Sequence, residues 1–341
     1  MTRRSSLGPS PLVALAVLLV AGALLTILLQ GHAAAPPIAA PPPGLSPGAG
    51  FASVVARALP SVVQIRSPRG LGSGVVLDAA GHVVTNAHVV AGARSFRVTL
   101  ADGSQDSATL RGAFVQGDLA VVQLHAARPR AATFADSSSV RVGDYALAIG
   151  NPLGLRSSVT QGVVSSTSRT VPEGGGVALP AVIQTSAPIN PGNSGGALVD
   201  SKGAVIGIPT LAATDPELGG AADGIGFAIA SNTVRSIAGQ LVAHGRVLHS
   251  GRAWLGVELR TLPGEGVVVA GTAAAGPAAR AGLRPGDVIV RVAGRPTASV
   301  DDVAAAIVAQ RPGHPITIGA RGPSGTRSLT VRLGELPASA R

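Results

Sequence analysis

Hydrophobic residues between position 51 and about position 209 fall into short runs, and Gly, Pro, Asp or Ser separates each run from the next. This spacing predicts short β-strands joined by turns, as in an all-β barrel or sandwich, and it does not suit alternating strands and helices. The clearest strands are expected at 61–65, 74–77, 83–85, 96–100, 119–124 and 145–149.

The pattern then changes from a strand period to a helix period. Asn232 is expected to be the N-cap of an amphipathic helix, and Gly245 is expected to follow its last residue. One face of this helix carries Val234, Ile237, Ala238, Leu241 and Val242. We expect this helix to end the domain that begins at residue 51.

A second, smaller unit begins near residue 252 and mixes both periods. Strands are expected at 266–269, 288–290, 316–319 and 328–333, and short helices at 278–283 and 300–310. Ser299 and Asp302 have the spacing of a capping box before the second helix. A compact α+β domain over 252–336 follows from this pattern.

The N-terminus has a different composition. Arg3 and Arg4 precede residues 12–29, an uncharged apolar run of 18 residues. This run is nearly long enough to cross a bilayer, and the flanking arginines predict that residues 1–10 stay in the cytoplasm while the rest is exported. Residues 11–29 are therefore expected to be a transmembrane anchor or a signal peptide. The length of the run favours an anchor, whereas Ala33-Ala34-Ala35 resembles a cleavage site.

Residues 30–50 are expected to form a Pro-rich linker, because residues 36–50 hold six prolines and no charge. The chain has 46 Gly, 26 Pro, 2% aromatic residues and no Cys, so disulfides, thiol nucleophiles and thiolate metal sites are excluded. A net charge of +10 would suit nucleic-acid binding. The arginines are scattered, however, and aromatic residues to stack on bases are scarce, so we expect a solvated surface and no nucleic-acid partner.

Residues 190–196 (NPGNSGG) place a serine in a glycine-rich loop. A serine hydroxyl needs a neighbouring base to become a nucleophile, and the oxyanion that it creates needs fixed donors. Ser194 is the candidate nucleophile, and the amides of Gly192, Asn193 and Ser194 are the candidate oxyanion hole.

His88 follows the strand-like run 73–85 and is the candidate base, while Asp118 leads into the strand 119–124 and is the candidate acid that orients it. Each residue alone is an ordinary polar residue at the edge of a strand. Together they have the chain order His, Asp, Ser of chymotrypsin-type enzymes, which predicts acyl transfer. No metal and no cofactor is expected.

The glycines around Ser194 also match the nucleophile elbow of α/β-hydrolases, which makes an esterase the competing hypothesis. That elbow needs a strand before the serine and a helix after it. Here Pro188 and Pro191 interrupt the preceding segment, and residues 197–208 have the pattern of two short strands around a turn. The pattern therefore favours the double-barrel class.

Five segments of this chain resemble the HtrA/Deg family of envelope proteases: 85–89 (TNAHV), 118–121 (DLAV), 149–155 (IGNPLGL), 189–196 (INPGNSGG) and 224–229 (GIGFAI). The unit from residue 254 through residue 287 is similar to the PDZ domain of that family. The resemblance implies a mainly β fold, with a chymotrypsin-like double β-barrel over 51–245, a PDZ domain over 252–336 and a homotrimer. The anchor and the linker look most like the membrane-tethered members.

The resemblance also implies binding residues. The specificity pocket is expected at Ile189, Ile225 and Phe227, and its apolar character predicts a preference for small or medium aliphatic side chains. PDZ domains add a peptide as an extra strand and hold its terminal carboxylate. The residues expected to do so are Arg252, Leu255, Gly256, Val257, Val303 and Ile307.

The chain departs from the family pattern at three places. Residues 112–118 are shorter than the usual loop before the aspartate, Ser186 replaces the usual Asp, and Ala230 replaces the usual Pro. In addition, Asn193 is a neutral residue before the serine and cannot pair with a new N-terminal ammonium. Activation by zymogen cleavage is therefore not expected, and neighbouring loops are expected to switch the peptide between residues 191 and 192.

The sequence thus predicts an exported serine endopeptidase of the cell envelope, with unfolded proteins, protein C-termini or a regulatory protein as substrates and the membrane as a partner through the N-terminal segment. The alternative is an inactive adaptor or chaperone-like holdase that works through its PDZ domain.

Overall fold

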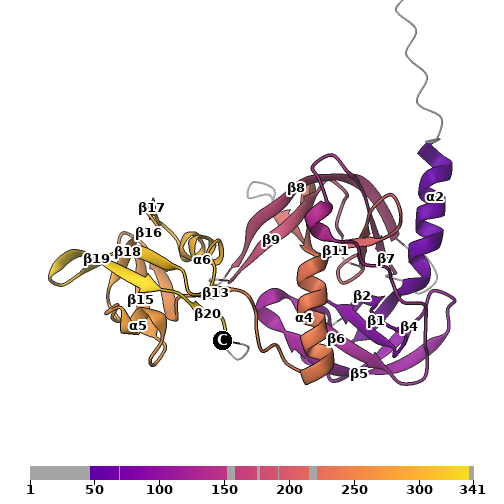
Figure 1. Ribbon diagram of the computed structural model, residues 1–341, viewed down its shortest axis with the longest axis horizontal. Coiled ribbons are helices and arrows are strands. Elements are labelled where there is room, and N and C mark those ends of the chain that lie inside the picture. The colour runs from indigo at the N-terminus through magenta and orange to yellow at the C-terminus, as the bar shows by residue number, and fades with distance from the viewer. Residues whose placement is uncertain are drawn as a thin grey trace, which may run out of the picture. The chain divides into compact units, whose positions relative to one another are not determined.

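The computed structural model describes residues 47–68, 70–151, 158–174, 177–190, 192–214 and 221–337 (Figure 1). The predicted cytoplasmic residues 1–10, the anchor or signal peptide at 11–29 and most of the linker lie outside the described residues. Within the described part of the chain, no helix is long and apolar enough to cross a membrane.

The first barrel is built from six antiparallel strands in the order β1-β2-β3-β6-β5-β4. They are β1 Val62–Ser67, β2 Gly70–Val76, β3 His82–Thr85, β4 Ser95–Thr99, β5 Gln105–Phe114 and β6 Leu119–Leu124. Its interior is filled by β-branched and aliphatic side chains, among them Val63, Ile65 and Val83, which are fully buried. The strands predicted in this region are confirmed.

A second closed barrel has the order β10-β11-β12-β9-β8-β7 (Figure 1). Its strands are β7 Tyr145–Gly150, β8 Ser158–Gly174, β9 Val177–Thr185, β10 Ala197–Val199, β11 Val205–Thr214 and β12 Ala221–Ala230. β10 and β11 form the predicted hairpin directly after the serine loop. Within the described residues 192–214, Ser194 leads into strand β10 and not into a helix, so the nucleophile-elbow alternative is excluded.

Helix α4, Ser231–His244, buries Val234, Ile237 and Leu241 in the core that the two barrels share. The predicted N-cap is wrong. Ala230 holds the cap position in an extended conformation, and Asn232 lies in the first turn, where its side chain donates to Asp136 Oδ1 at 2.7 Å. The predicted C-terminus is correct, because Gly245 ends the helix in the left-handed conformation with φ +69°.

Helix α2, Pro47–Ala58, which precedes the barrels, was not predicted. It begins within the residues that were expected to form the linker. Val54 and Ala58 are buried in the core that the barrels share, and the Phe51 ring meets the edge of Tyr145 with centroids 5.8 Å apart. Packing of these apolar residues stabilises the helix despite its glycines.

The C-terminal domain has its own core, with Val267, Ile289 and Ile318 fully buried. Its main sheet has the order β14-β15-β16-β18-β19, from Val257–Leu262, Gly266–Thr272, Val288–Val292, Pro315–Gly322 and Gly325–Arg332. The other elements are β13 Ala253–Trp254, α5 Pro277–Arg280, β17 Arg295–Pro296, α6 Val300–Val308 and β20 Gly334–Glu335. The predicted capping box of Ser299 and Asp302 is present, and α6 ends two residues earlier than expected.

Candidate active site

His88 and Asp118 are brought into direct contact at one end of the antiparallel pair β3 and β6, where Thr85 is paired with Ala120. His88 lies on the short helix α3, Ala87–Val90, which follows β3, and Asp118 lies between the 3-10 turn Val115–Gly117 and β6. His88 Nδ1 is 2.9 Å from Asp118 Oδ2, and the His88 backbone N–H donates to Asp118 Oδ1 at 3.0 Å. The shortened loop before Asp118 therefore does not prevent the contact.

The Asp118 carboxylate is buried, with 7% of its side chain exposed, whereas 50% of the His88 side chain is exposed. A buried carboxylate against Nδ1 fixes the ring so that Nε2 faces outward, which is the orientation that a general base needs. Asp118 has a left-handed backbone with φ +47°, and the Asn86 side chain donates to its carbonyl oxygen at 3.0 Å. Asn86 lies in the motif 85–89, but its hydrogen bond to Asp118 could not be predicted because the two residues are 32 positions apart in the sequence.

Thr210 was not predicted as a site residue. Its hydroxyl donates to Asp118 Oδ2, and its carbonyl oxygen accepts from Ser194 Oγ at 3.5 Å. One residue of β11 therefore contacts both the acid and the nucleophile. A threonine inside an apolar strand carries no sequence signal for such a role.

Ser194 lies in a tight loop that glycines make possible. Gly192 and Gly195 have φ of +111° and +79°, which side chains rarely adopt. A Cβ at Gly195 would also collide with the Ser73 carbonyl oxygen and with Thr85. The loop is further tied to the first barrel, because the Ser73 N–H donates to the Ser194 carbonyl oxygen at 3.0 Å.

The predicted oxyanion hole needs one correction. The Asn193 N–H donates to the Asn190 carbonyl oxygen at 3.0 Å, so it is already used within the turn. The Gly192 and Ser194 amides donate to no described residue, which leaves these two as the candidate donors. The Asn193 side chain is fully buried and donates to the Pro188 carbonyl oxygen at 3.4 Å.

The three predicted pocket residues do not share one surface. Ile189 is buried in the second barrel and lies so close to Gly226 that a Cβ there would collide with its side chain. Phe227 instead packs in the core between the barrels, and Ile225 is 36% exposed. Ile189 and Gly226 are thus in contact, while Phe227 belongs to a different cluster because it points to the other face of β12.

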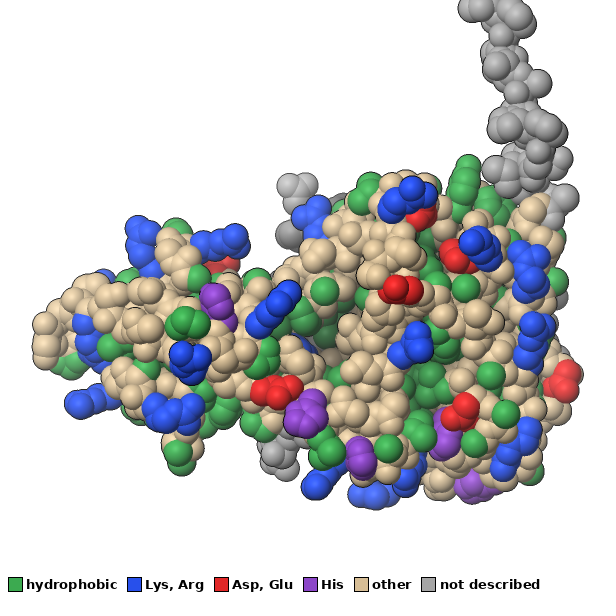
Figure 2. All heavy atoms as spheres, viewed as in Figure 1, with side chains coloured by type: hydrophobic (Ala, Val, Ile, Leu, Met, Phe, Trp, Pro, Cys, Tyr) green, Lys and Arg blue, Asp and Glu red, His purple; other side chains and the backbone are tan. Residues whose placement is uncertain are grey.

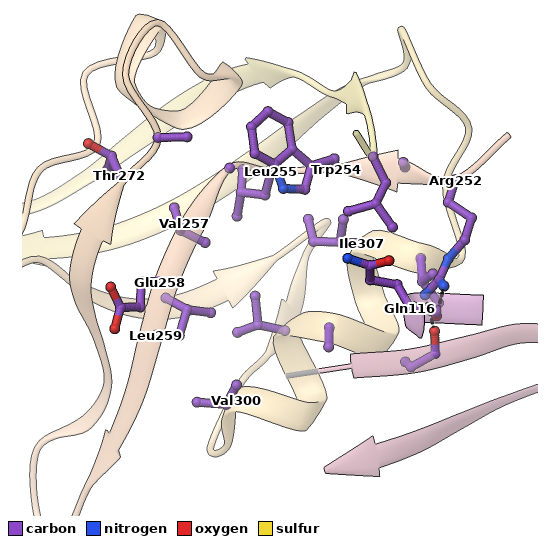
Figure 3. A pocket seen from close by; sticks show the side chains of 18 of the residues that line it. Gln116, Arg252, Trp254, Leu255, Val257, Glu258, Leu259, Thr272, Val300 and Ile307 are labelled. Carbon is purple, nitrogen blue, oxygen red and sulfur yellow. Dashed lines mark hydrogen bonds between the residues drawn. The ribbon is translucent and has the colours of Figure 1, made fainter. Parts of the chain in front are cut away.

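A groove of about 910 Å³ lies between the edge strand β14 and helix α6 of the C-terminal domain, and Gln116 and Ala178 also line it (Figure 3). All of the predicted peptide-binding residues line it, namely Arg252, Leu255, Gly256, Val257, Val303 and Ile307. Gly256 has φ +76°, and a Cβ there would press against Pro277 and Trp254. Glycine is therefore needed at the mouth of the groove for conformational reasons.

Arg252 has contacts that were not expected. Its guanidinium donates to the carbonyl oxygens of Gln116 and Ala178, as the dashed lines in Figure 3 indicate. These bonds use the side chain for contacts with backbone carbonyls, so a role in offsetting a peptide carboxylate does not follow from its position.

Charged side chains do not gather into one field on the face shown in Figure 2, where Lys and Arg are spread over the surface. Among the described residues, no group of His, Asp and Glu has an arrangement that could hold a metal ion.

A double barrel that carries a buried aspartate, a histidine in contact with it and a serine in a glycine loop defines a trypsin-like serine peptidase. The chain matches the family of the trypsin-like peptidase domain over residues 72–208 and the PDZ domain family over residues 268–321.

Curated relatives and solved structures agree with this class. The putative serine protease HhoB of Synechocystis sp. is 36% identical over 292 residues, which cover 79% of this chain and 67% of HhoB. The probable periplasmic serine endoprotease DegP-like of Halomonas elongata is 37% identical, and the match covers 80% of this chain and 58% of that protein. The chain thus spans between half and two thirds of the length of these relatives.

Among solved structures, the HtrA-type protease AlgW with decapeptide is 35% identical with a TM-score of 0.58, and the match covers 84% of this chain and 99% of that chain. The serine endoprotease from Yersinia pestis is 34% identical with a TM-score of 0.58, over 84% of this chain and 98% of that chain. The chain belongs to the HtrA/DegP family of serine proteases.

Proposed function

We propose that this chain is a serine endopeptidase of the cell envelope that cleaves unfolded or damaged envelope proteins or a regulatory substrate. The observation that carries the activity is the buried Asp118 carboxylate in contact with His88, with Thr210 joining Asp118 to Ser194. The location is supported by relatives named as periplasmic.

In the proposed mechanism each group has one role. Ser194 Oγ attacks the peptide carbonyl carbon while His88 takes its proton, and the C–N bond breaks as His88 returns that proton to the leaving amine. Asp118 holds the imidazole and stabilises its positive charge. The Gly192 and Ser194 N–H groups stabilise the oxyanion, and water then repeats the cycle on the acyl-enzyme.

Turnover of casein and of a short chromogenic peptide tests this function. Ser194→Ala should remove nearly all turnover and leave peptide binding intact, because no other group can replace the nucleophile. Ser201→Ala, at an exposed serine in the turn after β10, is the matched control. Equal turnover by the Ser194→Ala chain would refute Ser194 as the nucleophile, and absence of turnover by the unmodified chain would leave the adaptor or holdase function as the better account.

We further propose that Ile189 sets a preference for small or medium aliphatic side chains. Its side chain fills the space over Gly226, which limits the depth available to a substrate residue. Profiling of cleavage sites should return Val, Ala, Leu or Ile, and Ile189→Ala should shift the profile toward larger residues. Cleavage mainly after Arg or Lys would contradict the assignment.

The groove of the C-terminal domain is proposed to bind protein C-termini. Because β14 is an edge strand with α6 opposite, a peptide can add as a further strand and place its last side chain against Val303 and Ile307. Calorimetry should show binding of an apolar-ended peptide and loss of most affinity when its C-terminus is amidated. Equal affinity for both forms would rule out capture of the carboxylate.

A homotrimer is proposed to form through the surface around Phe51. Phe51 is partly buried against Tyr145, and Tyr145 and its strand neighbour Val163 remain 51% and 36% exposed. An exposed apolar surface of this kind favours association. Light scattering on the chain from Pro47 onward should give trimers that Phe51→Ala weakens, whereas a monomer would reject the proposal.

Attachment to the membrane is proposed to reside in the apolar run 12–29. The full chain should remain in the membrane fraction after alkaline carbonate extraction, and removal of residues 1–46 should release it. A full chain found only in the soluble fraction, with its N-terminus removed near residue 35, would instead identify a cleaved signal peptide.

A further inference from the structure

Ser73 is a fully buried residue of β2 in the first barrel, and its side chain reaches the nucleophile loop of the second barrel. Its hydroxyl donates to the Gly192 carbonyl oxygen at 2.5 Å and accepts from the Asn151 N–H at 2.8 Å. These partners are 119 and 78 residues away in the sequence. One hydroxyl therefore joins β2, the end of β7 and the loop before Ser194.

The backbone of Ser73 reinforces this junction. Its N–H donates to the Ser194 carbonyl oxygen at 3.0 Å, and its carbonyl oxygen accepts from Thr85 Oγ1 at 2.6 Å. Space around the junction is limited, since a Cβ at Gly150 would lie 2.5 Å from the Gly192 carbonyl oxygen. The loop is thus pressed against β7 and bonded to β2.

The contact determines the direction of one peptide group. The peptide between Gly192 and Asn193 is bonded at both ends, because its oxygen accepts from Ser73 Oγ and its N–H donates to the Asn190 carbonyl oxygen. A planar trans peptide held at both ends cannot rotate. The amides on either side of it are those of Gly192 and Ser194, the two candidate oxyanion donors, so their directions depend on this peptide.

We propose that Ser73 is a positioning residue whose hydroxyl fixes the oxyanion hole, an inference that rests on the proposed peptidase function. Gly192 has a φ of +111°, a region that favours glycine, and glycine can also adopt other backbone conformations. The hydrogen bond from Ser73 restricts Gly192 to the observed conformation. Without the hydroxyl, the Gly192 carbonyl and the Asn151 N–H lose a buried partner, and a rotated Gly192–Asn193 peptide becomes accessible.

Steady-state kinetics on the full chain tests the proposal with Ser73→Ala and a matched control, Ser231→Ala. Each change removes one fully buried serine hydroxyl, but the Ser231 hydroxyl donates to the Ala135 carbonyl oxygen at 2.7 Å and not to the nucleophile loop. Ser73→Ala should lower kcat by about 10- to 100-fold with little change in KM, somewhat less than the loss of a whole oxyanion donor. Ser231→Ala should stay within about threefold of the unmodified chain.

Two further readouts separate positioning from a general effect on folding. The affinity of a peptide boronate, whose tetrahedral adduct occupies the oxyanion hole, should fall in parallel with kcat/KM, while the pH profile keeps its shape because His88 and Asp118 are untouched. Ser73→Cys replaces the hydroxyl with a larger thiol that is only a weak hydrogen-bond donor. It provides a second comparison if the Ser73→Ala chain folds poorly.

A crystal structure of the Ser73→Ala chain gives an answer that does not depend on turnover. The Gly192–Asn193 peptide should be rotated or present in two orientations. An unchanged peptide would overturn the inference, and so would equal losses of kcat for Ser73→Ala and Ser231→Ala. Absence of turnover in the unmodified chain bears on the proposed function and is separate from this structural result.

Discussion

Replacement of Thr210 by Val tests how the site holds its aspartate. Valine keeps the shape of the side chain and removes only the hydroxyl that donates to Asp118 Oδ2. Thr210 and Asp118 are 4% and 5% exposed, so water cannot easily replace the lost donor. Asp118 keeps two donors, the His88 backbone N–H and Nδ1–H.

The size of the effect follows from these contacts. A hydrogen bond to a charged group contributes about 1.5–3 kcal/mol, so Thr210→Val should lower the free energy of unfolding by that amount. Because His88 still holds the carboxylate, we expect the activation free energy to rise by only about 1.4 kcal/mol. That is a fall of about tenfold in kcat/KM.

The assay is hydrolysis of a chromogenic peptide with an aliphatic residue at the cleavage site, measured beside urea unfolding. Thr210→Ser keeps the hydroxyl and should stay within about threefold of the unmodified chain. A Thr210→Val chain with unmodified kcat/KM would refute the view that this hydroxyl supports the acid.

Three other changes test the fold around the site. Hydrogen bonds from Asn232 and then Ser138 lower the pKa of Asp136 to about 2, so this carboxylate stabilises the fold fully above its unfolded pKa near 4, and the stabilisation is lost as the pH falls toward 2. Asp136→Asn should accordingly lower the melting temperature at pH 5 more than at pH 2, and equal shifts at both would contradict this. Leu241→Ala should cost about 3–5 kcal/mol in thermal or denaturant unfolding, because Leu241 is fully buried between the barrels. Arg327 donates to the buried Asp287 carboxylate at 2.6 Å, so Arg327→Leu should lower the free energy of unfolding of the C-terminal domain by about 1–3 kcal/mol. Fluorescence of Trp254, the one tryptophan of the chain, measures this unfolding.

The elements that the sequence predicted well have strong local signals. The hairpin of β10 and β11 is marked by apolar runs around a polar turn, and the capping box of Ser299 and Asp302 is formed by residues three apart. Helix α2 was missed because its glycines and Pro47 argue against a helix, and only packing against the barrels shows otherwise. Asn232 was taken for a cap because its side chain suits that position, but that side chain bonds Asp136.

The same distinction holds for the site. His88, Asp118 and Ser194 could be found because reactive side chains stand at strand edges in a known order. Thr210 and Ser73 could not, because a hydroxyl in a strand is ordinary until the strand register places it against a carboxylate or a carbonyl oxygen. Phe227 was assigned to the pocket from the family resemblance and its apolar character, but its side chain lies on the face of β12 opposite to Gly226, which contacts Ile189.

Covalent trapping of the nucleophile tests the central claim most directly. A peptidyl phosphonate with an aliphatic residue at the reactive position should label one residue per chain, and mass spectrometry should place the label on Ser194. Ser194→Ala should abolish labelling and His88→Ala should slow it by at least about a hundredfold, since His88 activates the hydroxyl. Labelling of another residue, or an unchanged rate in the His88→Ala chain, would contradict the assignment of the triad.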